Sequence, residues 1–214
     1  MTKTNASSEI ADIRQIVDFV AVAERLKREL RHSWLADGRR ESVGEHTWMM
    51  GLLALMLHSR LDQRIDIIKV LKMVLVHDIA EALVGDIPFF EESERKRNKA
   101  VAESEAIERI RKLLPDDIGM EIKTLWQEFE DRQTPEAKFA CALDNLEVQI
   151  QHNLAEFITW EPIEQDLVYT KVLQPCAHDQ FLSAMAKTVI ADAEAKMAEH
   201  GVDVDVLRQK HGFA

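Results

Sequence analysis

Apolar residues recur along this chain at intervals of three and four, a spacing that places side chains on one face of an α-helix. The first such stripe predicts a helix from about Ser8 to about Leu30 and consists of Ile13, Ile16, Val17, Val20 and Leu26. The same periodicity, bounded by caps and breakers, predicts further helices over about 42–60, 65–83, 93–114, 116–129, 134–157 and 177–199. Residues 159–172 favour neither state, and no run alternates as a half-exposed strand does.

Turn and cap signals fix several helix ends. Ser42-Val-Gly-Glu45 has the form of a capping box, so the second helix should start at Ser42 and carry His46 in its first turns. Before it, the polar residues 37–40 indicate a loop. Gly85-Asp86-Ile-Pro88 should end the third helix, and Thr134 followed by proline is a typical helix start.

Length and composition favour a single all-α domain. The chain has 214 residues with only seven Gly and five Pro, so we expect one domain over residues 1–214. Its 27 basic and 38 acidic residues give a net charge of −11. That charge disfavours a nucleic-acid polymer as partner, because such binding rests on Lys and Arg neutralising phosphates. A small phosphate ester remains possible, since a local cluster of arginines suffices.

Cysteine use and hydropathy indicate a cytoplasmic protein. Cys141 and Cys176 belong to no CxxC pair, so we expect reduced thiols. The first eight residues are polar and contain no apolar signal core. The longest apolar run, Trp48–Leu57, is too short to cross a bilayer, so no membrane partner is expected.

Candidate chemistry centres on the residues from His77 to Pro88. An apolar run ends there in His77-Asp78, and adjacent helical residues project about 100° apart, so the pair can share a ligand only at the helix edge. A metal ion is such a ligand. Glu81 lies three and four residues further on and returns to the same side. Burying this much charge is costly without a cation or hydrogen bonds to compensate it.

Four residues from three predicted helices complete a candidate metal site. Two imidazoles and two carboxylates suit a divalent transition metal and leave positions for water or substrate. The four proposed ligands are His46, His77, Asp78 and Asp144. A metal held there lowers the pKa of bound water and polarises a phosphoryl oxygen. Glu81 and Asp86 are then free to handle protons, although Asp86 also fits a plain turn residue.

Three segments of the chain resemble the HD-domain phosphohydrolases. These are Gly44-Glu45-His46, the stretch from His77 to Pro88, and residues 138–146, which include Asp144. The string His-Asp-x-x-Glu-x-x-x-Gly-Asp-Ile is far more specific than a lone His-Asp pair. The resemblance covers about Leu26 to Glu156 and is closest to the branch of 5'-deoxynucleotidases and similar HD domain-containing proteins.

This resemblance implies roles for particular residues. The metal ligands would be His46, His77, Asp78 and Asp144, and the catalytic residues would be Glu81 and Asp86. In the family, an Arg and a nearby Trp contact the substrate phosphate and sugar, and the matching residues here are Arg31 and Trp34. The resemblance also implies a homodimer and one divalent metal ion, for which Mn, Co, Fe, Ni, Zn and Mg are all candidates.

The sequence thus predicts an all-α HD-domain bundle around one metal site, with a core over about 26–156 and the C-terminal helices packed on it. We expect metal-dependent hydrolysis of a small phosphate monoester, with a nucleoside (deoxy) 5'-monophosphate as the first choice. A phosphodiester or alarmone substrate is the alternative within the same superfamily. A regulatory protein that binds nucleotide without turnover is the alternative outside enzymes. Glu81 and Asp86 favour an enzyme, because a purely structural metal would not require them.

Overall fold

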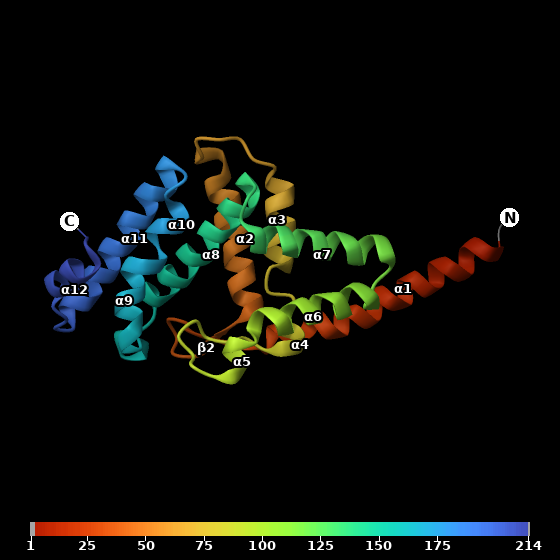
Figure 1. Ribbon diagram of the computed structural model, residues 1–214, viewed down its shortest axis with the longest axis horizontal. Helices are drawn as coiled ribbons and strands as arrows, with labels where there is room; N and C mark the ends of the chain where they lie inside the picture. The colour runs from red at the N-terminus through yellow and green to blue at the C-terminus, as the bar shows by residue number, and fades with distance from the viewer. Residues whose placement is uncertain (1–2, 214) are drawn as a thin grey trace.

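The computed structural model describes residues 3–213, and in this part of the chain helices dominate, as the sequence predicts (Figure 1). The first elements are α1 (Lys3–Ala23), the 3-10 turn η1 (Glu24–Lys27), and an antiparallel pair of strands, β1 (Leu30–Trp34) and β2 (Arg40–Ser42). The predicted extension of the first helix to Leu30 is therefore wrong, and so is the expectation of no strands.

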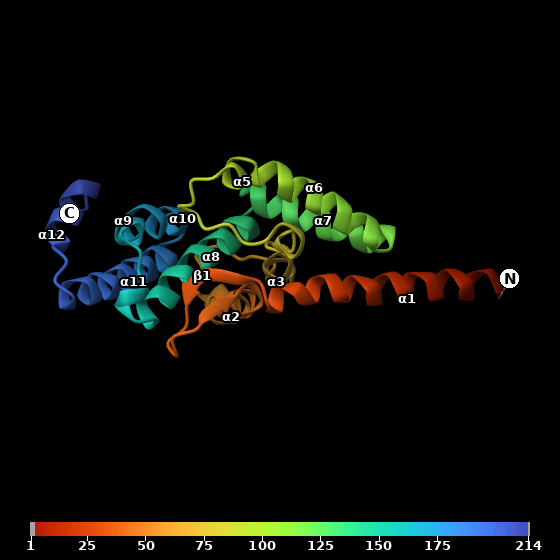
Figure 2. The same ribbon diagram turned by 90° about the horizontal axis from the view of Figure 1, so that it is seen from below.

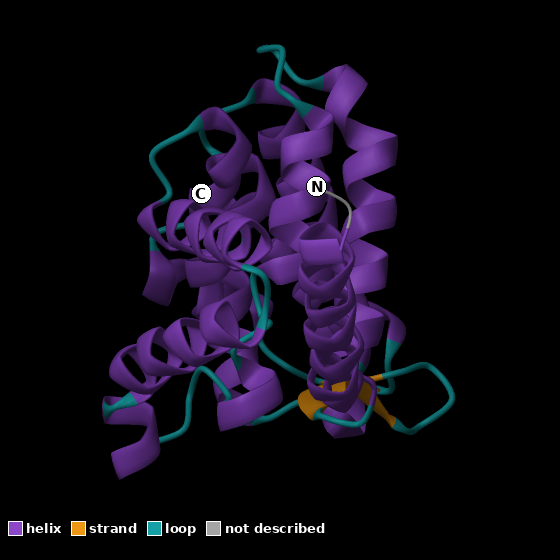
Figure 3. Cartoon of the chain, turned by 90° about the vertical axis from the view of Figure 1, so that its right-hand side faces the viewer, coloured by secondary structure: helices purple, strands orange, loops and turns teal. Residues whose placement is uncertain are grey.

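The hairpin of β1 and β2 lies at one end of the helices (Figure 3). Its turn depends on Gly38, whose φ of +84° is readily adopted only by glycine. The Leu35 N–H donates to the Arg39 carbonyl (2.8 Å), and Arg40 Nε donates to the Arg31 carbonyl (2.6 Å). Strands this short show no clear alternation, which is why the sequence pattern did not predict them.

The second helix, α2 (Val43–Leu57), starts as predicted. Glu45 N–H donates to Ser42 Oγ (3.3 Å) and Ser42 N–H donates to Glu45 Oε2 (2.9 Å), which is the complete capping box. The helix is followed by η2 (His58–Arg60). The capping box therefore fixes the position of His46, one residue after Glu45, relative to the hairpin.

The third predicted helix is interrupted. The sequence predicts one helix over about 65–83, whereas α3 (Ile67–Val76) and α4 (Glu81–Val84) are separated by a turn at residues 77–80. Gly85, with a φ of +79°, ends α4 as predicted. The His77-Asp78 pair consequently lies in a turn rather than inside a helix.

The next three helices form one side of the molecule (Figure 2). The predicted charged helix over 93–114 is divided at Asn98 into α5 (Glu94–Arg97) and α6 (Lys99–Leu113). After Pro115, α7 (Asp116–Asp131) packs against α6. At Gly119 the two helices are so close that a Cβ would collide with the Arg111 carbonyl oxygen.

The helix α8 (Pro135–Leu154), which has more buried residues than any other described helix, begins where Thr134 Oγ1 accepts the Ala137 N–H, as the sequence predicts. It runs through the centre of the molecule in Figure 1. The predicted last helix over 177–199 is α11, which starts three residues later. The remaining elements are η3 (Phe157–Thr159), α9 (Pro162–Lys171), α10 (Leu173–Cys176), α11 (Gln180–Glu199) and α12 (Val204–His211).

Two apolar clusters meet beside the turn after α3. The larger one joins α2, α3, α8 and α11, and its fully buried members include Met50, Phe139 and Leu143. The smaller one joins α6 and α7 and includes Ile79, from the turn itself. Polar residues of the turn are thereby held between two packed regions, where they are shielded from water.

Much of α1 extends beyond the other helices (Figure 2). Near its C-terminal end, Phe19 and Ala23 pack against the smaller apolar cluster. A separate stripe on the helix is exposed and consists of Ile10, Ile13, Val17 and Val20. Over residues 3–213, none of the helices combines the length and apolar character needed to cross a bilayer.

Candidate metal centre and cavity

His77 is fixed at the end of α3. Its backbone N–H donates to the Met73 carbonyl (2.8 Å), and its Nδ1 lies 2.8 Å from the Val74 carbonyl oxygen, a position in which Nδ1–H donates. That bond makes Nε2 the nitrogen with the free lone pair. Nε2 is buried and has no hydrogen-bond partner among the described residues. It lies 3.1 Å from Asp78 Oδ2.

His46, in the first turns of α2, is fully buried. Its Nδ1 lies 2.5 Å from Oε2 of Glu147 on α8, and its Nε2 has no hydrogen-bond partner in the described part of the chain. Burial and Arg31 disfavour the charged imidazole, but the carboxylates of Glu147 and Asp144 outweigh them and raise the pKa of His46 to about 10. The surroundings of this imidazole therefore attract positive charge.

All four predicted metal ligands converge. His46 Nε2 lies 3.3 Å from Asp144 Oδ1 and 4.0 Å from Asp78 Oδ2. Ligand atoms of His46, His77 and Asp144 all lie within 4.8 Å of one another. Two buried imidazole nitrogens without partners, facing two carboxylates, form a donor set that fits a divalent cation.

Sequence reasoning missed two buried carboxylates behind His46. Glu147 lies one helical turn after Asp144, and Glu41 precedes the capping Ser42. Both are almost fully buried, and with His46 they form a second group of potential ligands. Burial and the neighbouring Glu147 raise the pKa of Glu41 to about 7. The spacing of three between Asp144 and Glu147 was the available signal, because it puts both on one face of a helix.

Arg31, on β1, reaches the same centre. Its Nη1 donates to Asp78 Oδ2 (3.2 Å), and its Nε lies 3.6 Å from Glu41 Oε2. The side chain is 14% exposed and lines the cavity in front of the metal ligands. A guanidinium in this position can bind an anionic ligand of the same cavity.

Two more acidic residues, Glu81 and Asp86, lie near this centre. Glu81 is the first residue of α4, is 3% exposed, and has Oε1 3.7 Å from Lys99 Nζ. Burial, together with the carboxylates of Asp78 and Asp86, raises the pKa of Glu81 to about 9. Asp86, directly after the left-handed Gly85, also lines the cavity. Glu81 therefore holds a proton readily in a site of surplus negative charge.

These residues open into one cavity of about 550 Å³ between β1, α4–α6, α7, α8 and α9. Its lining includes Arg31, His77, Asp78, Glu81, Asp86 and Asp144. Trp34 is not among the described residues that line this cavity. Trp34 pairs with Arg40 across the hairpin, and its carbonyl accepts from Gln151 Nε2 (2.7 Å).

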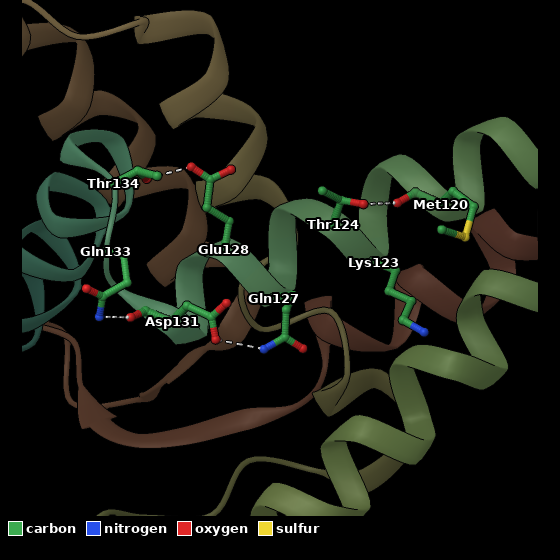
Figure 4. A pocket seen from close by; sticks show the side chains of 8 residues that line it. All are labelled: Met120, Lys123, Thr124, Gln127, Glu128, Asp131, Gln133 and Thr134. Atoms are coloured by element: carbon green, nitrogen blue, oxygen red, sulfur yellow. Dashed lines mark hydrogen bonds between the residues drawn. The ribbon is translucent and has the colours of Figure 1, made fainter.

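A second hollow, of about 360 Å³, lies along α7 and the turn to α8 (Figure 4). Its side chains are engaged locally: Gln127 Nε2 donates to Asp131 Oδ1 (2.9 Å), and Thr134 Oγ1 donates to Glu128 Oε1 (2.5 Å). Within residues 3–213, neither group of potential metal ligands includes a residue of this hollow. The chemistry-bearing groups therefore gather in the larger cavity.

The fold and the convergent histidines and aspartates define a protein class that comparison with known proteins also identifies. A family model described as HD domain matches residues 23–180, so the chain belongs to the HD-domain family. The human protein named 5'-deoxynucleotidase HDDC2 is 34% identical over 151 residues, which are 70% of this chain and 72% of that protein. The Schizosaccharomyces pombe 5'-deoxynucleotidase hdd1 is 38% identical over 142 residues, 64% of this chain and 70% of that one.

Solved structures show the same fold. A predicted metal-dependent phosphohydrolase from Magnetospirillum magnetotacticum MS-1 is 32% identical, with a TM-score of 0.75 and coverage of 86% of this chain and 94% of that chain. The PH0347 protein from Pyrococcus horikoshii OT3 is 25% identical, with a TM-score of 0.65 and coverage of 82% and 99%. The predicted all-α HD-domain fold is thus confirmed.

Proposed function

We propose that this protein is a metal-dependent phosphohydrolase that removes the phosphate of a nucleoside 5'-monophosphate, with deoxynucleotides as preferred substrates. The observation that carries the proposal is the convergence of His46, His77, Asp78 and Asp144, because the last three line a cavity that Glu81 also lines. The names of the curated relatives, 5'-deoxynucleotidases, support the substrate class.

One divalent metal ion would be held by His46, His77, Asp78 and Asp144. When bound, it supplies a Lewis acid that polarises a phosphoryl oxygen and acidifies a coordinated water. Two contacts orient the proposed histidine ligands: the Val74 carbonyl contacts His77 Nδ1, and Glu147 contacts His46 Nδ1. Both contacts leave the Nε2 lone pair of the imidazole for the cation.

Proton transfer falls to Glu81 and Asp86. Glu81 faces the centre without being needed as a ligand, and its raised pKa suits a group that accepts a proton from the attacking water. A cation next to it lowers that pKa again and keeps the carboxylate available. Asp86, on the same side of the cavity, would serve as the second acid or base.

Substrate charge is offset by Arg31, whose guanidinium lines the cavity next to Asp78. Trp34 stays a prediction from the resemblance, because it is not among the described residues that line the cavity. We further propose that residues 1–214 act as one domain in the cytoplasm, and that the partner is a small phosphorylated molecule rather than a nucleic acid.

A substrate panel tests this function. The metal-loaded protein is incubated with 5'-mononucleotides, 3'-mononucleotides, cyclic nucleotides, dinucleotides and single-stranded oligonucleotides, and the phosphate or nucleotide released is measured. We expect phosphate from the 5'-mononucleotides and none in the Glu81→Ala control. Cleavage of the diesters with mononucleotides untouched would overturn the proposal, as would binding of mononucleotides without any turnover.

A homodimer is also proposed, with the exposed apolar stripe of α1 as its contact. Ile10, Ile13, Val17 and Val20 recur at helical spacing on a face distinct from Phe19, which packs inward. An apolar stripe this long on a projecting helix is typical of a helix that pairs with another. A second copy of the chain presents the same stripe and can pair with it symmetrically.

A further inference from the structure

The cavity extends well past the metal ligands along α8. Asp144, Val148 and His152 are spaced by four residues, so they lie on one face of the helix, and all three line the cavity. Two helical turns separate the first from the last, a rise of about 12 Å. The far end of the cavity is therefore a separate region with its own residues.

That far end contains a buried polar cluster drawn from three elements: His32 and Ser33 on β1, His152 on α8, and Glu164 on α9. Ser33 Oγ lies 3.3 Å from His152 Nε2. Glu164 Oε1 lies 3.5 Å from His152 Nε2 and 3.4 Å from His32 Nε2. Glu164 is 3% exposed. Ordering so many polar groups away from water costs free energy unless they gain partners.

Two side chains in this part of the cavity, His32 and Gln149, keep hydrogen-bonding capacity for a ligand. His32 Nε2 is buried and makes no hydrogen bond with any residue in the described part of the chain. Gln149, 4% exposed, lines the cavity and uses Nε2 to donate to Asn153 Oδ1 (3.0 Å). Its carbonyl oxygen remains a candidate acceptor. A ligand that reaches this end can therefore find both donors and acceptors.

Apolar and aromatic side chains line the same cavity as this cluster. The Phe90 ring meets the His32 ring edge-to-face at 4.8 Å, and Ile87, Val148 and Leu167 are among the apolar residues of the lining. Aromatic and apolar side chains next to a few hydrogen-bonding groups suit a heterocyclic ring with a polar edge. A sugar phosphate alone bears no such ring.

We propose that His32, Ser33, Gln149 and His152, held in place by Glu164, bind the polar edge of the substrate's nucleobase. This inference rests on the proposed function, because it assigns the two ends of one cavity to the two ends of one substrate. The phosphate lies at Arg31 and the metal ligands, and the base lies two turns along α8. These residues are binding residues, and they take no part in the chemical step.

The experiment compares substrates with and without a base. Kinetic constants are measured for the four deoxynucleoside 5'-monophosphates and for 2-deoxyribose 5-phosphate, with wild-type protein and the variants His32→Phe and Gln149→Leu. We expect each variant to lower kcat/KM for its best nucleotide about 10-fold, mainly through KM, and to leave 2-deoxyribose 5-phosphate unchanged. His32→Phe keeps the aromatic contact with Phe90, so the loss reports the imidazole nitrogens.

His200→Phe is the matched control, because His200 also stacks on a phenylalanine, Phe157 at 4.6 Å, but does not line this cavity. It should leave every substrate unchanged. Equal losses on the nucleotides and on 2-deoxyribose 5-phosphate, or no loss at all, would overturn the inference and leave the cluster as a link between β1, α8 and α9.

A binding measurement separates this inference from the proposed function. Deoxynucleosides without phosphate are titrated into wild-type protein and His32→Phe and followed by calorimetry. If no mononucleotide is hydrolysed, the proposed function fails, while nucleoside binding that weakens about 10-fold in the variant still supports the base site. Nucleoside binding that is absent, or equal in both proteins, contradicts the base site whatever the turnover.

Discussion

The contact between His46 Nδ1 and Glu147 leaves Nε2 as the imidazole nitrogen that faces Asp144. Glu147→Gln keeps the shape of the side chain but loses the negative charge that orients and polarises the ring. We expect the affinity for a divalent metal to fall about 10-fold to 100-fold, the range for loss of such an outer partner. Competition with a chromophoric chelator measures this. Glu194→Gln, a buried carboxylate paired with Arg208 outside the cavity, is the control and should bind metal normally.

Glu81 and Asp78 should respond differently to removal. Glu81→Ala should retain the metal and lose turnover by roughly 100-fold or more, because a proton-transfer group is missing while the ligand set is intact. Asp78→Ala should lose metal affinity and thermal stability together, because it removes a ligand and one of the two carboxylates next to Arg31. Metal analysis of both purified variants beside their activity checks this. Equal metal loss would mean that Glu81 is itself a ligand.

Arg31→Ala should lower kcat/KM for a nucleoside 5'-monophosphate about 10-fold to 100-fold, the effect of losing a charge-assisted hydrogen bond of about 1.5–3 kcal/mol. Steady-state kinetics at saturating metal measures it. Arg39→Ala is the control, because Arg39 is exposed, pairs with Glu45 of α2 and does not line the cavity. If both variants behave alike, the effect is one of overall charge and not of phosphate binding.

At the scale of elements, the contact of α6 with α7 depends on one residue. A Cβ at Gly119 would collide with the Arg111 carbonyl oxygen, so Gly119→Ala must push the two helices apart. We expect the free energy of unfolding to fall by about 1–3 kcal/mol, as for other overpacked contacts. Denaturant titration measures it, with Met120→Ala, an exposed neighbour on α7, as the control. Unchanged stability in Gly119→Ala would mean that the helices separate freely.

The elements also show what local sequence predicts and what it does not. The capping box at Ser42 and the proline start of α8 are local signals, and both helix starts are confirmed. The break after Val76 is not local. The apolar pattern continues through residues 77–80, where Ile79 is buried in the smaller cluster. The helix nevertheless ends before these residues, and His77 lines the cavity. Tertiary packing therefore overrides the helical pattern at residues 77–80, which include the proposed ligands His77 and Asp78.

For the whole molecule, the exposed stripe of α1 makes a prediction about assembly. The double variant Ile13→Glu with Val17→Glu should shift the protein from dimer to monomer, because charges replace the apolar contact between two copies. Light scattering coupled to size exclusion measures the mass. Arg14→Glu, on the same helix but paired with Asp18 at the surface, is the control and should stay dimeric. A wild-type protein that is already monomeric at micromolar concentration would contradict the proposal.

The sequence identified the side chains that meet at this centre better than it identified the residues around them. His46, His77, Asp78 and Asp144 belong to a motif whose residue types indicate metal binding, and the fold brings His46, His77 and Asp144 within 4.8 Å of one another, with Asp78 beside the two histidines. Glu41 and Glu147 were missed because a single acidic residue on a helix or strand is ordinary until its burial is known. The cluster around Glu164 was missed because its members are far apart in the sequence, from residue 32 to residue 164.

Because α8 carries both Asp144 and His152, the distance between the two ends of the cavity is set by helix pitch and not by any loop. With phosphate and base bound as proposed, α8 fixes the distance between them. A nucleoside diphosphate or triphosphate is longer than a monophosphate, so it cannot place its terminal phosphate at one end and its base at the other. Discrimination by the number of phosphates then needs no moving lid, because two turns of α8 fix the distance between the phosphate end and the base end of the cavity.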